Sequence, residues 1–292
     1  MNLEQGETPL STDAHETPTS RLELVWGAPG LARLAASTVM VLGCGGVGSN
    51  CIEALARGGV GTLIVVDGDA VAPSNINRQA IAYTTTVGRR KVEVTAELVQ
   101  AINPTARVIS LDRFVRADDV ENLFAEALSG VERIDYVIDA IDTVSTKLAI
   151  AEWAERTATP LIASMGGANK LDPEKLRICD IAQTSHDPLA RIMRKECRRR
   201  GIRHLTVLSS FEEPCELPLT CPLPQATSDD VGGARDVATL GESASEAQRD
   251  AVEHKATRPT LGTVSYLPPI MGQMIAGFVI RRLVETSGGV TE

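Results

Sequence analysis

The stretch VLGCGGVGSN, residues 41–50, constrains this chain most, because it continues the uninterrupted apolar run TVMVLG. Such a run is typical of a strand that is buried on both faces of a parallel sheet. The stretch satisfies the G-x-G-x-x-G pattern of a strand-to-helix turn, in which backbone amides at the helix N-terminus can hold phosphate. Its glycines are Gly43, Gly45, Gly46 and Gly48. The pattern predicts a nucleotide site, and a tight turn without a ligand is the alternative.

The rest of the chain alternates between short apolar runs and amphipathic stretches. Strands are predicted at 38–43, 62–67, 106–111, 134–142, 160–168, 175–182, 204–210 and 262–267. Helices are predicted at 27–36, 50–59, 87–102, 117–128, 143–157, 188–200 and 268–286. This order predicts an α/β fold: a Rossmann-like, doubly wound, mostly parallel sheet with helices on both faces. Ligands on such sheets bind beyond the carboxyl ends of the strands.

Composition divides the chain into a long ordered part and two polar segments. Residues 1–20 are predicted to be a disordered tail, and residues 222–260 a flexible insertion. The ordered part, 21–286, then holds an ATP-binding core at 37–168 and a smaller substrate-binding extension at 169–221 and 261–286. Apolar residues make up 43% of the chain, which is enough to build a core of this size.

Charge and cysteine content exclude several classes of protein. The net charge of −9 excludes a generally basic protein, so any nucleic-acid binding requires a local patch. The six cysteines form no C-x-x-C pair, which disfavours a zinc site and suits the reducing cytoplasm. The N-terminus has no signal-peptide pattern, and the apolar stretch 270–280 is shorter than the about 20 residues that a membrane span needs. We therefore expect a cytoplasmic protein without a membrane anchor.

Residues after the second predicted strand indicate which nucleotide is bound. Asp67 lies where an acid commonly accepts hydrogen bonds from ribose hydroxyls, which would serve NAD and ATP equally. The segment VDGDAVAPSNINRQ then adds a polar cluster: Asp69, Asn75, Asn77, Arg78 and Gln79. A hydride-transfer enzyme does not need this cluster, whereas an enzyme that cleaves a triphosphate needs cations for the phosphate charge of its transition state. The cluster favours ATP, and a capped polar loop is the alternative.

Two further residues fit a triphosphate. On the predicted helix 87–102, Lys91 falls on the same face as Val87 and Val94. An inward lysine needs an anion unless its stem reaches out to solvent. Asp142 follows a predicted strand and is a candidate magnesium ligand, with a helix N-cap as the alternative.

The motifs GCGGVGSN, D-G-D, S-N-I-N-R-Q, V-G-R-R-K and D-A-I-D together resemble the ThiF/MoeB/HesA superfamily, relatives of the ubiquitin-activating enzymes that adenylate a carboxylate with ATP. The resemblance implies that Asp67 holds the ribose, that Arg78 and Lys91 contact the phosphates and that Asp142 binds Mg²⁺. Asn75 and Gln79 would lie near the nucleotide. Arg21 resembles the arginine that enters the ATP site of a partner subunit, which implies a homodimer. Pro18 stands where many members carry a second arginine.

Residues 187–204 form the only strongly basic segment that we identify, with seven Lys or Arg against one Glu in 191–204. Helical geometry predicts a cationic arc of Arg191, Arg194, Lys195, Arg198 and Arg199. The opposite, apolar arc would hold Leu189, Ile192, Met193 and Cys197. Such a stripe favours a polyanion such as tRNA over an ordinary solvated face, although no aromatic side chains interleave with it.

Residues 166–202, 207–214 and 262–283 are similar to one branch of the superfamily, the tRNA threonylcarbamoyladenosine dehydratases. This branch implies that the threonyl carboxylate of a modified tRNA adenosine is adenylated and then cyclised with release of AMP. A cysteine-desulfurase or sulfur-acceptor system is an additional possible partner. The alternatives are an enzyme that adenylates a ubiquitin-like sulfur carrier, an NAD-dependent oxidoreductase and a non-catalytic scaffold.

Overall fold

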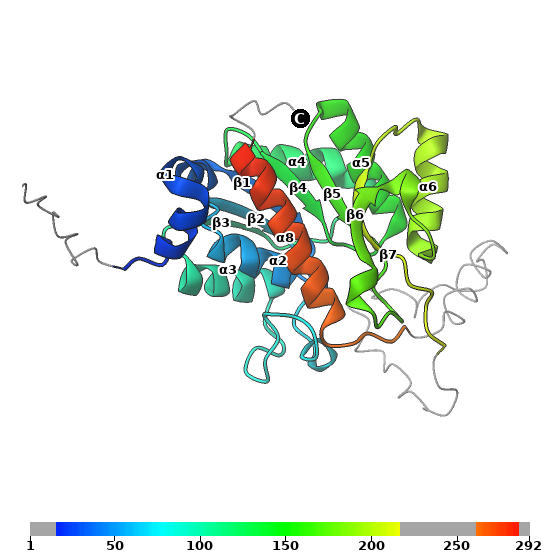
Figure 1. Ribbon diagram of the computed structural model, residues 1–292, viewed down its shortest axis with the longest axis horizontal. Coiled ribbons are helices and arrows are strands. Elements are labelled where there is room, and N and C mark those ends of the chain that lie inside the picture. The colour runs from blue at the N-terminus through cyan, green and yellow to red at the C-terminus, as the bar shows by residue number, and fades with distance from the viewer. Residues whose placement is uncertain (1–15, 217–260, 286–292) are drawn as a thin grey trace, which may run out of the picture.

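The computed structural model describes residues 16–216 and 261–285 (Figure 1). The predicted insertion at 222–260 and most of the predicted tail lie outside these ranges. One seven-stranded sheet forms the centre, in the order β3-β2-β1-β4-β5-β7-β6. Its strands are β1 (Thr38–Leu42), β2 (Thr62–Val66), β3 (Arg107–Leu111), β4 (Tyr136–Asp139), β5 (Leu161–Ser164), β6 (Leu176–Asp180) and β7 (Thr206–Ser210). Only the β6–β7 pair is antiparallel, so the predicted fold class is confirmed.

Helices cover both faces of this sheet. They are α1 (Ser20–Ala36), α2 (Gly46–Arg57), α3 (Lys91–Ile102), α4 (Val120–Ser129), α5 (Val144–Thr157), α6 (Pro188–Arg200) and α8 (Leu267–Glu285). One face carries α1, α2, α3 and α8, and the other carries α4, α5 and α6. In Figure 1, α8 runs across the front of the sheet beside α2. Among these described helices, none is both long and apolar enough to span a membrane.

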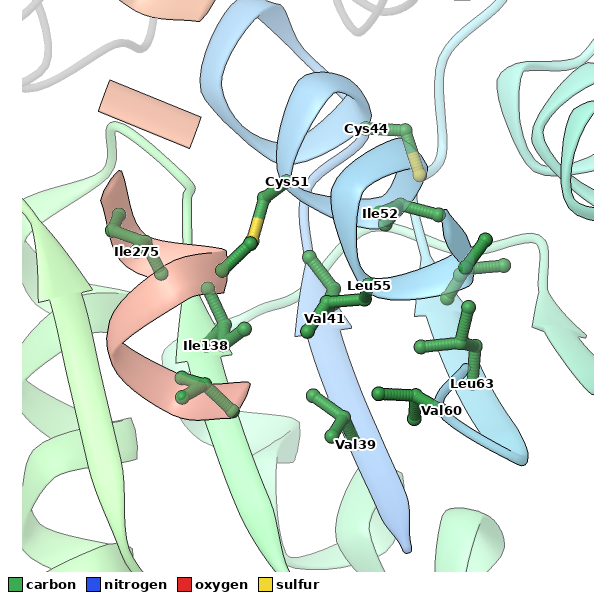
Figure 2. Close-up of a cluster of buried hydrophobic side chains, with 14 of the residues drawn as sticks. Val39, Val41, Cys44, Cys51, Ile52, Leu55, Val60, Leu63, Ile138 and Ile275 are labelled. Atoms are coloured by element: carbon green, nitrogen blue, oxygen red, sulfur yellow. The ribbon is translucent and has the colours of Figure 1, made fainter. Parts of the chain in front are cut away.

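Alternation along the central strands explains how one sheet builds two cores. Val39 and Val41 of β1 face α2 and α8, where Leu55 and Ile275 pack against them (Figure 2). Met40 and Leu42, one residue out of step, belong to the opposite cluster with α4 and α5. Side chains of a strand alternate between faces, so a strand covered on both sides must be apolar throughout.

Register brings the predicted site residues to one level of the sheet. Leu42, the last residue of β1, pairs with Val66 of β2 and with Asp139 of β4. The next residues of the three strands, Gly43, Asp67 and Ala140, therefore leave the sheet side by side. The order β3-β2-β1-β4-β5 also reverses direction between β1 and β4, which is where parallel sheets open a crevice for ligands.

Several predicted elements differ from the structure in their bounds, and three of these differences involve contacts or backbone angles that the structure defines. Residues 262–267 form no strand; Gly262 instead exchanges two hydrogen bonds with Asn169, and the carbonyl oxygen of Thr263 accepts one from the side chain of Asn77. The helix predicted from 87 begins at Lys91, since Gly88 has a φ of +87° and bonds back to Val71. The helix predicted from 27 begins earlier, at Ser20, and is kinked at Gly27, where φ is +65°.

Candidate nucleotide site

The glycine turn joins β1 to α2 through two positions that only glycine fits. Gly43 has a φ of +94°, a region that other residues rarely adopt. A Cβ atom at Gly48 would lie 1.8 Å from the carbonyl oxygen of Gly43. Helix α2 begins at Gly46, directly beyond the tip of β1. The amides of its first turn have no partners within the helix, so this turn offers hydrogen-bond donors to an anion.

Asp67 supports this turn from the neighbouring strand. Its carboxylate accepts hydrogen bonds from the backbone N–H of Cys44 at 2.7 Å and of Asp69 at 2.8 Å. Burial raises the pKa of Asp67, an effect that the nearby Lys91 ammonium opposes. An ionised carboxylate has about four lone-pair positions, so further acceptor capacity remains for ribose hydroxyls.

Lys91 is buried beside Asp67, with only 7% of its side chain exposed. Its Nζ lies 2.8 Å from Oδ2 of Asp69 and 3.7 Å from Oδ1 of Asp67. The prediction that Lys91 points inward on the same helix face as Val94 is therefore confirmed, but the inclusion of Val87 in that face was wrong. Val87 precedes α3, and Lys91 is the first residue of that helix and not part of a stripe with Val87. The carboxylates of Asp67 and Asp69 supply the anionic partners that a buried lysine needs.

Arg78 reaches the turn from the loop that follows the short 3₁₀ helix η1 (Pro73–Asn75). A Cβ atom at Gly46 would lie 3.1 Å from Cγ and 3.2 Å from Cδ of Arg78, so the arginine stem covers the start of α2. The backbone of Arg78 is fixed there by Asn50, whose Nδ2 donates to the Arg78 carbonyl oxygen at 2.9 Å. Partial burial lowers the pKa of the guanidinium, although at neutral pH arginine keeps its charge.

The other polar residues of this loop have different surroundings. Asn75 accepts from the backbone N–H of Ala72 at 3.0 Å and shapes the turn. Asn77 donates to the carbonyl oxygen of Thr263 at 3.1 Å. Gln79 is buried, and its Oε1 has no hydrogen-bond partner among the residues that the structure describes. A buried acceptor without a partner is unfavourable, so Gln79 is suited to a donor that a ligand brings.

Sequence reasoning missed a buried ion pair at the end of β4. Nζ of Lys147 in α5 lies 3.0 Å from Oδ2 of Asp139, and the two side chains are 0% and 1% exposed. Oδ1 of Asp139 accepts from the backbone N–H of Ile141 at 3.2 Å, which shapes the turn after β4. Asp139 can be recognised from the sequence as an acidic residue at the end of a strand. Lys147, on the next helix, cannot be told from an ordinary surface lysine by its position in the sequence.

This turn presents Asp142 to solvent. Asp142 is exposed and does not cap α5, whose N-cap residue is Thr143, so the capping alternative is not supported. Its neighbour Ile141 lies close to the glycine turn, since a Cβ atom at Gly43 would lie 3.3 Å from the Ile141 side chain. Asp142 therefore offers an unburied carboxylate at the β4 side of the crevice.

Cys44, inside the turn, is not suited to chemistry. Its side chain is completely buried, and burial raises the pKa of its thiol to about 12. In Figure 2 it lies at the edge of the apolar cluster with Ile52. No group of three or more His, Cys, Asp or Glu residues within the described ranges could hold a metal ion by itself.

Helix α6 begins near the same edge of the sheet. Asp187 caps it through the backbone N–H groups of Leu189 and Ala190, at 2.9 and 3.1 Å. The other carboxylate oxygen accepts from the N–H of Gly166, just past β5, and from Oγ of Ser209, both at 3.0 Å. This buried aspartate fixes the first turn of α6 to the tips of two strands.

The cationic arc of α6 is only partly free. Arg194 is half-buried and donates to the carbonyl oxygen of Thr184 at 2.8 Å, while Arg199 pairs with Glu196 at 2.7 Å. Three of the predicted arc residues are exposed and have no ion pair within the described part of the chain: Arg191, Lys195 and Arg198. Ile192 is 49% exposed, so its placement on the apolar arc was wrong: only Ala190, Met193 and Cys197 are fully buried.

Arg21 lies apart from the glycine turn of its own chain. It belongs to the first turn of α1, and the preceding Thr19 lies about 4.0 Å from a Cβ position at Gly59, in the turn before β2. That turn is at the amino edge of the sheet, whereas the glycine turn is at the carboxyl edge. The Arg21 side chain is 85% exposed.

The structure thus gathers three of the predicted residues around one turn. Arg78 covers Gly46, Lys91 pairs with the aspartate that binds Cys44, and Asp142 follows the residue that contacts Gly43. Two cations and one exposed carboxylate beside a helix N-terminus can hold a phosphate chain and a divalent cation.

Similarity to known proteins agrees with this arrangement. The chain is 44% identical over 196 residues to a tRNA threonylcarbamoyladenosine dehydratase of Bacillus subtilis, covering 67% of this chain and 75% of the relative. It is 39% identical over 180 residues to the dehydratase of Escherichia coli, covering 62% and 64%. The crystal structure of E. coli TcdA in complex with ATP matches with a TM-score of 0.73 at 26% identity, over 95% of this chain and 98% of that one.

The sequence model of the ThiF family matches residues 19–290, which is nearly the whole chain. The match includes the glycine turn, the loop of Arg78, both lysine–aspartate pairs and helix α6. The chain belongs to the ThiF family.

Proposed function

We propose that this chain is an ATP-dependent dehydratase that adenylates the threonyl carboxylate of threonylcarbamoyladenosine in tRNA and cyclises it. One observation carries the proposal: Arg78, Lys91 and Asp67 surround the same helix N-terminus at the tip of β1. The relatives that are 39% to 44% identical bear the name of this activity.

The first step of the reaction is the attack of the threonyl carboxylate on the α-phosphate of ATP, with pyrophosphate as the leaving group. Negative charge grows on the phosphates during this step, and prepositioned donors stabilise it most effectively where water is excluded. Arg78 and the amides of the first turn of α2 are placed to act as such donors. Lys91 would exchange part of its pairing with Asp69 for the phosphates.

The second step is an attack on the acyl adenylate by a nucleophile of the same modified base. A ring closes, AMP leaves with one carboxylate oxygen, and the tRNA has lost the elements of one water molecule. An intramolecular attack needs chiefly positioning from the protein. Such a reaction does not require a cysteine nucleophile, which agrees with the buried and protonated state of Cys44 in the glycine turn.

Asp142 is suited to hold magnesium for this reaction. Mg²⁺ is usually bound through one or two carboxylates together with substrate phosphates, not by a cage of protein ligands. An exposed carboxylate next to the glycine turn meets that requirement, and bound Mg²⁺ would neutralise phosphate charge there.

Helix α6 supports tRNA as the substrate. Arg191, Lys195 and Arg198 form an exposed cationic row on an otherwise acidic chain, and Asp187 fixes the start of that helix to the strand tips. Contacts to phosphates orient a nucleic acid without reading its sequence.

We further propose a homodimer in which Arg21 serves the ATP site of the second subunit, because that side chain is exposed and far from its own site. ATP and tRNA are both available in the cytoplasm, so we expect the protein to act there. Its use of a sulfur-acceptor partner stays a prediction.

The test is incubation of the purified chain with ATP, Mg²⁺ and tRNA that carries threonylcarbamoyladenosine. We expect AMP, pyrophosphate and a nucleoside lighter by one water in mass spectrometry. Unmodified tRNA is the matched control and should give no AMP. Formation of AMP that requires a small carrier protein in place of tRNA would contradict the proposal and favour the sulfur-carrier alternative.

A further inference from the structure

Arg78 is held by two oxygen atoms of its own loop. Its Nη1 donates to the carbonyl oxygen of Ser74 at 2.9 Å and to Oδ1 of Asn77 at 2.8 Å. A guanidinium group has five N–H donors, and these two bonds use both donors of Nη1. The Nε and Nη2 donors remain, and together they form the edge that suits a bidentate contact with phosphate.

Asn77 is itself oriented by a distant part of the chain. Its Nδ2 donates to the carbonyl oxygen of Thr263 at 3.1 Å, which directs its Oδ1 toward Arg78. Thr263 lies in the segment 261–266, which leads into α8 and forms no strand. The position of this carbonyl group therefore depends on whatever fixes that segment.

Asn169 fixes the segment 261–266 through two hydrogen bonds with Gly262, which we call the clasp. The backbone N–H of Asn169 donates to the carbonyl oxygen of Gly262 at 2.9 Å, and Oδ1 of Asn169 accepts from the N–H of Gly262 at 2.8 Å. Asn169 has a φ of +57°, a conformation that asparagine and glycine tolerate better than other residues. The residue follows β5, so the clasp anchors Gly262 to the carboxyl edge of the sheet.

We propose that Asn169 is a positioning residue for Arg78, acting through Gly262, Thr263 and Asn77. The inference rests on the proposed function, because it assigns Arg78 to the phosphates of ATP. A free arginine side chain samples many rotamers, and fixing them beforehand removes that entropy loss from the binding and reaction steps. The clasp lets a loop on the far side of the crevice fix the direction of a phosphate-binding group.

The decisive comparison is between two substitutions at position 169. Asn169→Gly keeps the backbone conformation and the backbone bond but removes the Oδ1 acceptor. Asn169→Asp keeps an acceptor and is the matched control. Asn77→Ala removes the inner link of the same chain of contacts and provides a second variant should the first fold poorly.

Affinities for ATP and for AMP, measured by calorimetry without tRNA, are the main readout. We expect Asn169→Gly and Asn77→Ala to weaken ATP binding about five-fold, the size of one lost hydrogen bond of ordinary strength. AMP lacks the outer phosphates, so its affinity should stay within about two-fold. Asn169→Asp should bind ATP as the unsubstituted chain does.

A double-mutant cycle with Arg78→Ala separates positioning from general damage. If Asn169 acts through Arg78, adding Asn169→Gly to Arg78→Ala should have no further effect on ATP affinity. Equal losses for ATP and AMP, additive losses in the cycle, an Asp variant as weak as the Gly variant, or an Arg78→Ala variant with full ATP affinity would each overturn the inference. A chain that binds ATP but leaves the modified tRNA unchanged would overturn only the proposed substrate, and the affinities would still decide the role of Asn169.

Discussion

The glycine turn and helix α6 both concentrate charge, but they hold it in opposite ways. Around the turn, two lysines are buried and paired at short range, Lys91 with Asp69 and Lys147 with Asp139. Along α6, the cations Arg191, Lys195 and Arg198 are exposed and have no ion pairs within the described residues. One region is organised before a ligand arrives, and the other is organised by the ligand.

The difference teaches what each region can do. Charges shielded from water interact strongly and lose little energy to reorganisation, so they suit a transition state. Exposed charges are screened by salt and act roughly additively, so they suit a long polyanion that binds at several points. Substitutions should therefore have large and specific effects at the turn and small, salt-dependent effects on α6.

The largest effect should come from breaking the fully buried pair. Lys147→Met leaves Asp139 buried without its partner, which we expect to lower the free energy of unfolding by about 3–5 kcal/mol in urea titrations. The double variant Lys147→Met with Asp139→Leu should recover most of that loss, because it removes both charges.

The matched control is the pair that joins α6 to α5, in which Arg200 lies 3.1 Å from Glu152 and both side chains are partly exposed. Glu152→Gln should change the free energy of unfolding by less than about 1 kcal/mol. Equal losses for the buried and the exposed pair would remove the contrast between the two regions.

The next effect concerns catalysis. Arg78→Ala should slow AMP formation from ATP and modified tRNA by about 10²–10³-fold, the range for removing one prepositioned donor to a charged transition state. Arg198→Ala, on α6, should leave the single-turnover rate at saturating tRNA within about two-fold. A rate that falls equally in both variants would show that α6 takes part in the chemistry.

A smaller effect is expected for the exposed cations in tRNA binding. Each of Arg191→Ala, Lys195→Ala and Arg198→Ala should weaken tRNA binding only a few-fold and lower the slope of log affinity against log salt by about one. The matched control is Arg57→Ala, because Arg57 lies at the amino end of the sheet and pairs there with Glu53. An unchanged salt slope in all three variants would exclude α6 as the phosphate-binding surface.

The two regions also differ in how far the sequence predicts them. The strands and the glycine turn follow from local pattern, since a doubly covered strand must be apolar and Gly43 must adopt a positive φ. Arg78, Lys91 and Asp142 could be nominated because they lie just beyond strand ends, and the register of β1 with β2 and β4 does bring those ends together.

Contacts between distant segments could not be predicted in this way. Nothing in the sequence pairs Lys147 with Asp139, or Asn77 with Thr263, because these bonds depend on how α5 and the segment before α8 pack. The cationic arc of α6 was only partly correct for the same reason: Arg194 turns back to Thr184, which lies outside the helix. Periodicity gives the face of a helix, but tertiary contacts decide which side chains on it are free.

The smallest expected effect is the absence of reactivity at Cys44. Its place at a helix N-terminus would by itself lower a thiol pKa, but burial dominates and raises the pKa to about 12. At pH 8 only roughly one in ten thousand of these thiols is ionised, so iodoacetamide should not modify Cys44 in the folded chain. Cys179, which is only half-buried, should react before Cys44, and urea should make both of these cysteines accessible. Peptide mass spectrometry reads the two sites separately. Rapid native labelling of Cys44 would show that the turn opens to solvent, and the glycine turn would then resemble α6 in being organised only when a ligand binds.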